Sequence, residues 1–531
     1  MPATRSSSRK TATRKAKAPT SSTRGRPRAT TDIRSVRKQK LSSEAYLNSL
    51  PKPQVLHAPG KRRTLLVCGT GGEGQFGLGP DMTGEIKRPR LHSIIEQMVN
   101  DGQLGESGIE CIAAGGMHSL LVDSLGQVWS FGINDSMALG RTTKGPDIDS
   151  DEAESTPGLV EGLIGFRAVS VTASDNLSLA VSDKGQLRAW GLFKAQEGFL
   201  GFGSTSSGPR KAAGIPQALH EFAKVPVCSV SCGENHVLAL TCTGLVYAWG
   251  DGEYYQLGDR ANGLRPEPLH LRNIVLIGTG YYTSFAVDKD GVVFAFGLNQ
   301  MRQTGVSNDR GGEAEVIKAP TPIDALHPDQ HNGARVIQIS GGDHQTIFLL
   351  DNGEVWGCGR CDEGRLGLPQ DHPEMLAIEN SFQVAMEEQR VAMEEQREAE
   401  SRLHESEAQN ASPSASTSRH HGRPKTAPKV QEAVRDTRVA EPVRIPFRSP
   451  LVDNGSGSGQ QPKIVSISAG SRYSLACDDA GIMYSWGEGT SCQLGLGPID
   501  MAETPTAVLN TALRNYAVVE LSAGGQHVLI R

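Results

Sequence analysis

Histidine recurs in one sequence context, shortly after a glycine-containing turn, and histidine is the side chain best suited to proton transfer near neutral pH. His118, His236, His344 and His527 follow the segments AGGM, CGEN, SGGD and AGGQ. We interpret them as one repeat position on one face of the fold. A structural hydrogen-bonding position is the plainer interpretation, and metal binding is the alternative.

Two other spacings match motifs that bind nucleotides or metals. Gly69, Gly71 and Gly74 fit GxGxxG, but no helix is expected behind this phosphate loop. Cys358 and Cys361 have the spacing of a zinc or redox pair, but no second pair stands nearby. The sequence has no Ser/His/Asp elbow, P-loop or HExxH motif. We therefore expect no metal, no cofactor and no covalent catalytic residue.

A repeat sets the elements that position these residues. An apolar strand, a small-residue turn, a second apolar strand, an Asp-Gly-like turn and an aromatic-Gly pair recur in six complete copies. His118 precedes Gly132 by fourteen positions, and four other copies keep this spacing. His344 precedes Gly359 by one residue more, which indicates a bulge. Each copy predicts about four antiparallel strands.

The seventh copy is divided between the two ends of the sequence. Residues 518–531 (VVELSAGGQHVLIR) match its first half, and residues 62–79 match its second half. Joining the halves removes sheet edges that would otherwise be exposed. The sequence therefore predicts an all-β fold, a seven-bladed β-propeller over residues 61–531 with a split closing blade.

Two segments interrupt the repeat. Residues 1–60 are rich in Ser, Thr, Arg, Lys and Pro, which predicts a disordered basic arm. Residues 370–463 are predicted to be a low-complexity and helical insertion between blades. They contain the doubled heptad VAMEEQR at 384–397, which predicts a short charged helix that is either solvated or bound to a partner helix.

Charge is distributed unevenly along the chain. Residues 1–40 contain thirteen Lys and Arg and one acid, Asp32, whereas the remainder contains 41 basic and 58 acidic residues. The arm therefore attracts polyanions. No apolar run reaches the ~20 residues of a membrane span, and no secretory signal is seen, so we expect a nuclear or cytosolic protein without a membrane contact.

The basic arm suggests two compatible functions. Its Arg-Gly-Arg-Pro core resembles an AT-hook, whose guanidinium groups enter the narrow minor groove of A·T-rich DNA. A nuclear-import signal read by an import receptor is the plainer interpretation. The residues predicted to contact DNA are Arg24, Gly25, Arg26, Pro27, Arg28, Arg34, Arg37, Lys38 and Lys40.

The aromatic-Gly turns, the AGGxH strands and the run FGINDSMALGR at 131–141 together resemble the regulator of chromosome condensation family, the guanine nucleotide exchange factors of the small GTPase Ran. The resemblance implies a fungal-like or otherwise divergent member that is nuclear and chromatin-associated. It also implies binding to GDP-bound and nucleotide-free Ran. The alternative is a propeller scaffold that binds chromatin or protein partners without exchange activity.

The resemblance also implies positions for the contacts. In that family a short β-wedge after the NDxxALGR turn presses on the phosphate-binding region of Ran, and matching places it at Gly158–Gly165. Gly72 and Ala195 stand at positions where other members of the family often carry an acidic residue. The residues implied to contact the GTPase are Asp135, His118, His344, His527, Gly158, Leu159, Val160 and Glu161. A loop implied to meet the acidic histone surface carries Arg260, Arg265 and Arg272.

Overall fold

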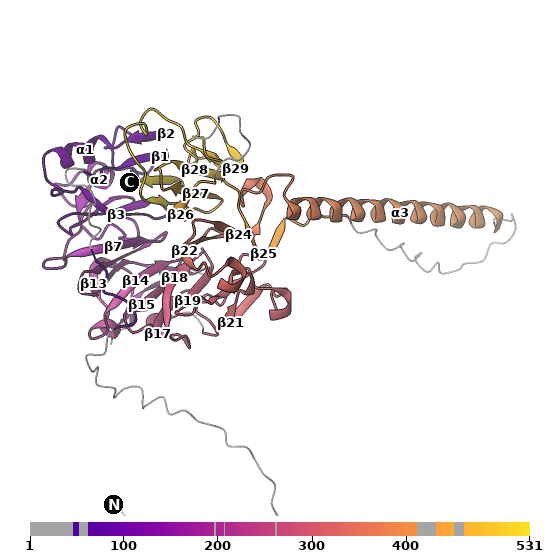
Figure 1. Cartoon of the computed structure of the whole chain (residues 1–531), viewed down its shortest axis with the longest axis horizontal. Coiled ribbons are helices and arrows are strands. Elements are labelled where there is room, and N and C mark those ends of the chain that lie inside the picture. Colours follow the sequence, from indigo (N-terminus) through magenta and orange to yellow (C-terminus); the bar gives the residue numbers. More distant parts are fainter. Residues whose placement is uncertain are drawn as a thin grey trace, which may run out of the picture. The chain divides into compact units, whose positions relative to one another are not determined.

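The computed structural model describes residues 46–52, 62–195, 198–205, 208–260, 263–410, 432–450 and 461–531. Within these ranges the strands form seven four-stranded antiparallel sheets and one smaller sheet of three strands. The seven larger sheets are the blades of a propeller, so the predicted all-β, seven-bladed fold is confirmed (Figure 1).

Six blades follow one another along the chain, each built from its inner strand outward. Blade 1 is β3 (Ile109–Ala114), β4 (His118–Asp123), β5 (Val128–Gly132) and β6 (Gly158–Leu159); blade 2 is β7 (Ala168–Ala173), β8 (Leu177–Ser182), β9 (Leu187–Gly191) and β13 (Ala213–Ala218); blade 3 is β14 (Val227–Cys232), β15 (His236–Thr241), β16 (Val246–Gly250) and β17 (Gly263–Pro268). Blade 4 is β18 (Ile274–Thr279), β19 (Thr283–Asp288), β20 (Val293–Leu298) and β21 (Val316–Pro322); blade 5 is β22 (Val336–Gly341), β23 (Gln345–Leu350), β24 (Val355–Arg360) and β25 (Arg438–Arg444); blade 6 is β26 (Ile464–Ala469), β27 (Tyr473–Asp478), β28 (Met483–Glu488) and β29 (Met501–Ala507).

The closing blade combines both ends of the repeat region, as predicted. Its strands are β30 (Leu521–Ala523), β31 (His527–Ile530), β1 (Leu66–Thr70) and β2 (Glu85–Leu91), in that order. Leu66 pairs with Ile530, and Cys68 pairs with Val528. This antiparallel pairing closes the ring, and Figure 1 shows the C-terminus beside β1.

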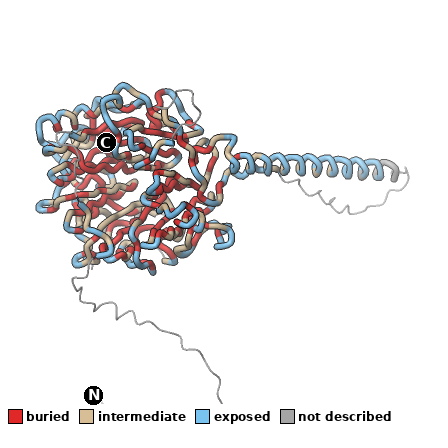
Figure 2. The backbone as a smooth tube through the Cα atoms, viewed as in Figure 1, coloured by how far each residue is buried: buried red, intermediate tan, exposed pale blue. Residues whose placement is uncertain are grey.

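The aromatic-Gly repeat locks each blade to its neighbour. Trp190 of blade 2 is fully buried, and its indole N–H donates to the carbonyl oxygen of Ala138 at 2.7 Å. Gly140 takes a φ of +65°, and a Cβ there would lie 2.6 Å from Trp190 Nε1. The close approach therefore requires glycine. Figure 2 shows the buried residues concentrated along the blade strands.

Two short helices lie in the loops of the propeller. Helix α1 (Ser93–Asn100) connects β2 to β3 and buries Ile95 and Val99. Helix α2 (Ser150–Ser155) lies between β5 and β6, where the side chain of Asp149 caps it by accepting from two backbone N–H groups.

The insertion is placed differently from the prediction. Helix α3 (Pro373–Asn410) leaves the propeller between β24 and β25, so it interrupts blade 5 rather than separating two blades (Figure 1). The predicted insertion also contains β25 itself, a blade strand. The doubled heptad is helical, as predicted, but the helix is longer, and Arg390 forms ion pairs with Glu387 and Glu394.

The end of the predicted disordered arm packs on the propeller. The backbone N–H of Asn48 donates to the carbonyl oxygen of Cys242, and its side-chain amide donates to the carbonyl oxygens of Thr241 and Ile274. Asn48 therefore bridges blades 3 and 4. Its backbone and amide N–H groups find acceptors in carbonyl oxygens of both blades, which holds this segment on the propeller. This part of the arm prediction is wrong. Residues 1–45 lie outside the described residues.

Candidate functional site

The two ends of the propeller differ in the chemistry of their turns. One end carries the turns that join the first and second strands of each blade. At the middle position of these turns blades 2, 3 and 5 place Asp175, Glu234 and Asp343, respectively. We call this end the acidic rim and the other end the opposite rim.

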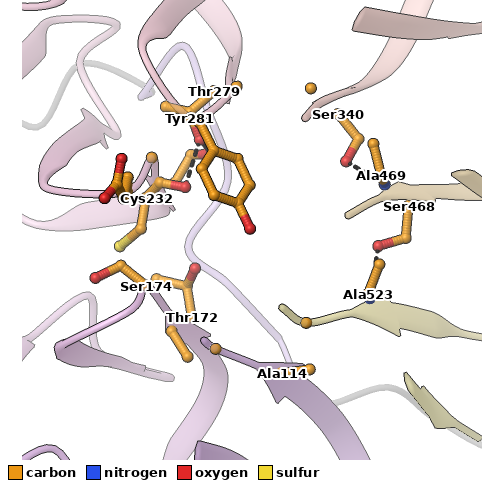
Figure 3. A pocket seen from close by; sticks show the side chains of 18 of the residues that line it. Ala114, Thr172, Ser174, Cys232, Thr279, Tyr281, Ser340, Ser468, Ala469 and Ala523 are labelled. Carbon is orange, nitrogen blue, oxygen red and sulfur yellow. Dashed lines mark hydrogen bonds between the residues drawn. The ribbon is translucent and has the colours of Figure 1, made fainter. Parts of the chain in front are cut away.

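A polar cavity of about 170 Å³ runs along the propeller axis and opens between these turns. The inner strand of every blade contributes to its lining. Hydroxyl groups on the inner strands connect neighbouring blades: the hydroxyls of Ser340 and Ser468 accept from the backbone N–H groups of Ala469 and Ala523 (Figure 3). The phenol of Tyr281 extends into this space. The axis is therefore a rigid polar frame for the acidic rim.

A second cavity, the rim cavity, has a volume of about 420 Å³ and shares Asp175, Tyr281 and Gly525 with the axial cavity. Its lining also includes Asp135 and Lys194. It is the larger of the two and is lined by both carboxylates and a cation. Such a cavity can accept a basic side chain from a protein partner, because paired opposite charges inside a partly dehydrated site attract strongly.

Crowding perturbs the carboxyl groups of the acidic rim. Burial raises the pKa of Asp175 to about 6; Glu234 and Asp343 add to this shift, and Lys194 opposes it. Burial also raises the pKa of Asp343 to about 6, opposed by Arg472 and Arg365. Both groups are mainly ionised at neutral pH, so the rim carries negative charge there. Perturbed carboxyl groups in a cavity are typical of functional sites.

The NDSMALGR run forms a turn that projects one carboxylate. The side chain of Asn134 accepts from the N–H of Leu139 and donates to the carbonyl oxygen of Arg141, which holds the turn closed. Arg141 in turn donates to the carbonyl oxygens of Ala153 and Thr156. Asp135 is left exposed, paired with Lys144 at 3.2 Å. The structure therefore brings Asp135 to the acidic rim, next to Asp175.

The extra three-stranded sheet also arises at this end. It consists of β10 (Phe193–Ala195), β11 (Gly198–Thr205) and β12 (Gly208–Arg210), in the connection between β9 and β13 of blade 2. Phe193 and Phe202 are buried at its base and stack on each other. The N–H of Lys194 donates to Asn235 Oδ1 at 3.1 Å, so the base is fixed to blade 3. Sequence reasoning missed this sheet.

The predicted wedge at Gly158–Gly165 is not an independent element. Gly158 and Leu159 form β6, the outer strand of blade 1, paired with Ser130 and Trp129. Val160 is buried in the core, and Glu161 accepts from the N–H of Thr142. Gly158 and Leu159 complete blade 1, and Val160 and Glu161 pack beside it, so these four residues form no separate wedge. Their contact with the GTPase stays a prediction.

The histidine position is structural at three of its four predicted members. His118, His236 and His527 are buried, and Nε2 of each meets the hydroxyl of a serine in the next blade, at 2.8, 3.0 and 2.9 Å. Each serine donates its proton to a loop carbonyl, so the imidazole Nε2–H must donate to the serine. Burial lowers the pKa of His118 to about 4 and those of His236 and His527 to about 3. Burial leaves little of the His118 and His527 side chains exposed for the predicted contacts with the GTPase.

His344 does not occupy this position. Gly359 pairs with Gln345, so blade 5 keeps the common register and the predicted bulge is absent. His344 lies one residue earlier, half-buried beside Asp343, and its Nδ1–H donates to the carbonyl oxygen of Asp343. Burial lowers its pKa, and nearby arginines lower it further. His344 is thus a member of the acidic rim, for a different reason than predicted.

The three arginines predicted to share a loop are separated. Arg265 lies in strand β17 and pairs with Glu221 at 2.6 Å, whereas Arg260 precedes the strand and pairs with Glu267. Arg272 follows β17 and is exposed toward the opposite rim. Two of the three arginines therefore have acidic partners within this chain. The predicted DNA-binding residues between Arg24 and Lys40 lie outside the described residues.

Comparison with known proteins decides the family. The model of the RCC1-like domain matches residues 64–530. This chain belongs to the RCC1-like domain family. Protein pim1 of Schizosaccharomyces pombe is 31% identical over 511 residues, covering 92% of this chain and 79% of pim1. Guanine nucleotide exchange factor SRM1 of Saccharomyces cerevisiae is 30% identical, covering 87% of this chain and 86% of SRM1.

A solved RCC1-like structure has the same fold. Prp20p from Saccharomyces cerevisiae, described with its binding properties to Gsp1p and histones, superposes with a TM-score of 0.67 at 29% identity, covering 90% of this chain and 92% of Prp20p. A structure of Kap60 bound to yeast RCC1 (Prp20) matches with the same TM-score at 28% identity, covering 90% of this chain and 94% of that chain. In the described part of this chain, no helix is long and apolar enough to cross a membrane.

Proposed function

We propose that this protein is a guanine nucleotide exchange factor for the small GTPase Ran. The observation that carries the proposal is the acidic rim, where Asp175, Glu234 and Asp343 come from three blades to one position of the repeat. Asp175 and Glu234 line the axial cavity, and Asp175 also lines the rim cavity, which is large enough for a partner's side chain. Membership in the RCC1-like family and the similarity to exchange factor SRM1 support it.

Exchange requires no covalent step by this protein. A factor that binds the nucleotide-free GTPase more tightly than the loaded form must weaken nucleotide binding by the same factor, because the two equilibria are linked. Carboxylates at the rim attract basic groups of the GTPase and raise the association rate. A rigid propeller then holds the empty GTPase without itself rearranging.

We assign the wedge role to the sheet β10–β12 rather than to residues 158–165. The sheet arises at the acidic rim, stands outside the blades and is fixed at its base by Phe193 and by the hydrogen bond to Asn235. An element of this kind can press on the phosphate-binding region of a GTPase seated on the rim. Replacing residues 196–207 with a short Gly-Ser link should lower stimulated GDP release by at least about tenfold. Equal stimulation of GDP release from Ran by the unaltered chain and by this variant would exclude the role.

The decisive experiment measures release of fluorescent GDP from purified Ran with the full chain. Acceleration by catalytic amounts of the chain is the expected result. The second candidate function is a propeller scaffold that binds chromatin or proteins without exchange. Binding to Ran without acceleration would favour the scaffold, and the replacements at Gly72 and Ala195 of acids found in other family members are the features that favour it.

Chromatin association and nuclear import form the second part of the proposal. Prp20p is described with histones, and yeast RCC1 with Kap60. We propose that the basic residues of the arm contact DNA and an import receptor, which places the protein in the nucleus. Of the three arginines considered for histone contact, Arg260 and Arg265 form ion pairs with Glu267 and Glu221, and Arg272 is exposed near the opposite rim. We therefore propose Arg272 as the histone contact.

The arm can be tested separately from the propeller. Phosphate contacts make log K fall by roughly 0.9 per log unit of salt for each contact. Deleting residues 1–40 should therefore weaken DNA binding and flatten its salt dependence, while GDP release from Ran in solution is retained. Unchanged DNA binding at all salt concentrations would contradict the assignment.

A further inference from the structure

Lys194 has a singular place in the rim cavity. Among the described residues that line this cavity, Lys194 supplies the one Lys or Arg side chain, whereas Asp135 and Asp175 supply carboxylates and Tyr281 supplies a phenol. The lysine belongs to β10, at the base of the extra sheet, and not to the blade repeat. It therefore links the extra sheet to the acidic rim.

The backbone of Lys194 is held on both sides. Phe193 before it is buried in the core, and the N–H of Lys194 itself donates to Asn235 Oδ1 at 3.1 Å. Asn235 directly follows Glu234 in the turn between β14 and β15. The stem of the half-buried lysine thus starts from a fixed point between blades 2 and 3.

Charged groups face Asp175 from several elements. Glu234 approaches from the β14–β15 turn and Asp343 from the β22–β23 turn, and both disfavour a second negative charge. Asp135 lies across the rim cavity, on the loop after β5. Lys194 is the cation that opposes these acids at Asp175. Without it, burial and like charge would protonate this carboxyl group at a higher pH.

We infer that Lys194 is a positioning residue whose ammonium group keeps the Asp175 carboxylate ionised and facing the rim cavity, ready for a basic side chain of the GTPase. The inference rests on the proposed exchange function. Lys194 acts through Asp175 and makes no demand on the nucleotide itself. Its effect should therefore depend on pH rather than reduce activity equally under all conditions.

The test is the pH profile of kcat/KM for GDP release from Ran between pH 5 and 8. Protonation of Asp175 removes its charge, so activity should fall as the pH drops through about 6. In Lys194→Met the midpoint should move upward by about half a unit to one unit, because an opposing charge is lost from a partly exposed pair. Lys194→Arg should restore the original midpoint. Lys184→Met, on the opposite rim of the same blade, is the matched control.

Two further measurements keep the outcomes distinct. In an Asp175→Asn background, Lys194→Met should no longer shift the midpoint; a persistent shift, or a uniform loss at every pH, would overturn the inference. Titration of the Asp175 carboxyl carbon by ¹³C NMR needs no GTPase, and its midpoint should rise in Lys194→Met. If the unaltered chain does not accelerate GDP release from Ran at any pH, the proposed function fails. In that case the NMR titration still decides the role of Lys194.

Discussion

Two positions of the same repeat, only two residues apart, have opposite fates. The position of His236 is buried in every blade that carries histidine there, and it joins neighbouring blades through serine. The position of Glu234 faces the cavities at the acidic rim. A turn of two residues is enough to change a side chain from an internal link to a contact for partners. Residue type alone therefore misleads, because a buried histidine side chain has little surface with which to contact a partner.

The largest expected effect is a loss of activity on changing residues at the position of Glu234. Asp175→Asn combined with Glu234→Gln should lower kcat/KM for GDP release from Ran by about a hundredfold, since two charge-assisted contacts are worth about 3 kcal/mol together. The thermal midpoint at neutral pH should not fall, because Asn removes the cost of ionising the buried Asp175 carboxyl group. Asp479 is an exposed acid at the opposite rim, so Asp479→Asn is the control. This variant should accelerate GDP release from Ran as well as the unaltered chain does. Full activity in the double variant would mean that the partner docks elsewhere.

The next effect falls on stability instead. His236→Ala removes a buried side chain and its hydrogen bond to Ser284, which should cost about 2 kcal/mol of unfolding free energy. Release of GDP at 25 °C, well below the unfolding transition, should remain within about twofold of normal. Urea denaturation measures the first and the fluorescent assay the second. A stable but inactive variant would place the histidine position in the functional site after all.

Lowering the pH should change the unfolding free energy in opposite directions through the two positions. The folded pKa of His236 lies near 3, below its ordinary 6.5, so the unfolded chain binds the proton first and stability is lost as the pH falls below 6.5. This amounts to about 1.4 kcal/mol per pH unit for each such histidine. The raised pKa of Asp175 has the opposite sign and adds stability as the pH falls from about 6 toward 4. Denaturation series at several pH values should be flatter for His236→Gln and steeper for Asp175→Asn; parallel series would contradict both pKa shifts.

The smallest effect comes from building a histidine–serine link that blade 5 lacks. Gln345 stands at the histidine position of blade 5, and in the described structure its Oε1 and the hydroxyl of Ser474 in blade 6 are both buried without a hydrogen-bond partner. Gln345→His should supply the missing donor to Ser474 and raise the unfolding free energy by about 1 kcal/mol at pH 8. The same change in a Ser474→Ala background should bring no gain. Destabilisation in both backgrounds would show that this junction cannot accept an imidazole.

Much of this architecture could be predicted because repeats constrain one another. Six copies with a fixed spacing determine the strands, and the two half-copies determine the closing pair Leu66 and Ile530. The sequence misleads at blade 5, because His344 matches the repeat in residue type whereas Gln345 matches it in position. Strand β25 cannot be recognised from its sequence RVAEPVR, because it lies in a low-complexity segment and only Val439 and Pro442 are buried.

The acidic rim was only partly predictable. Asp135 was found through a motif, whereas Asp175, Glu234 and Asp343 appear only when the seven turns are aligned on the aromatic-Gly pair rather than on histidine. The extra sheet β10–β12 gives no alternating pattern in FKAQEGFLGFGST, because its strands are short and rich in glycine. Its position depends on the stacking of Phe193 on Phe202 and on the contact with blade 3, which no local pattern encodes.

The pairing of Leu66 with Ile530 also constrains how the protein is made. A ribosome adds roughly 5 to 20 residues per second, so the first partner waits roughly half a minute to a minute and a half for the second. During that interval β1 has a bare backbone edge, and such an edge pairs readily with other nascent chains. Protection of β1 and β2 by a chaperone until β31 emerges, rather than the folding of any single blade, should therefore limit the yield of the finished ring.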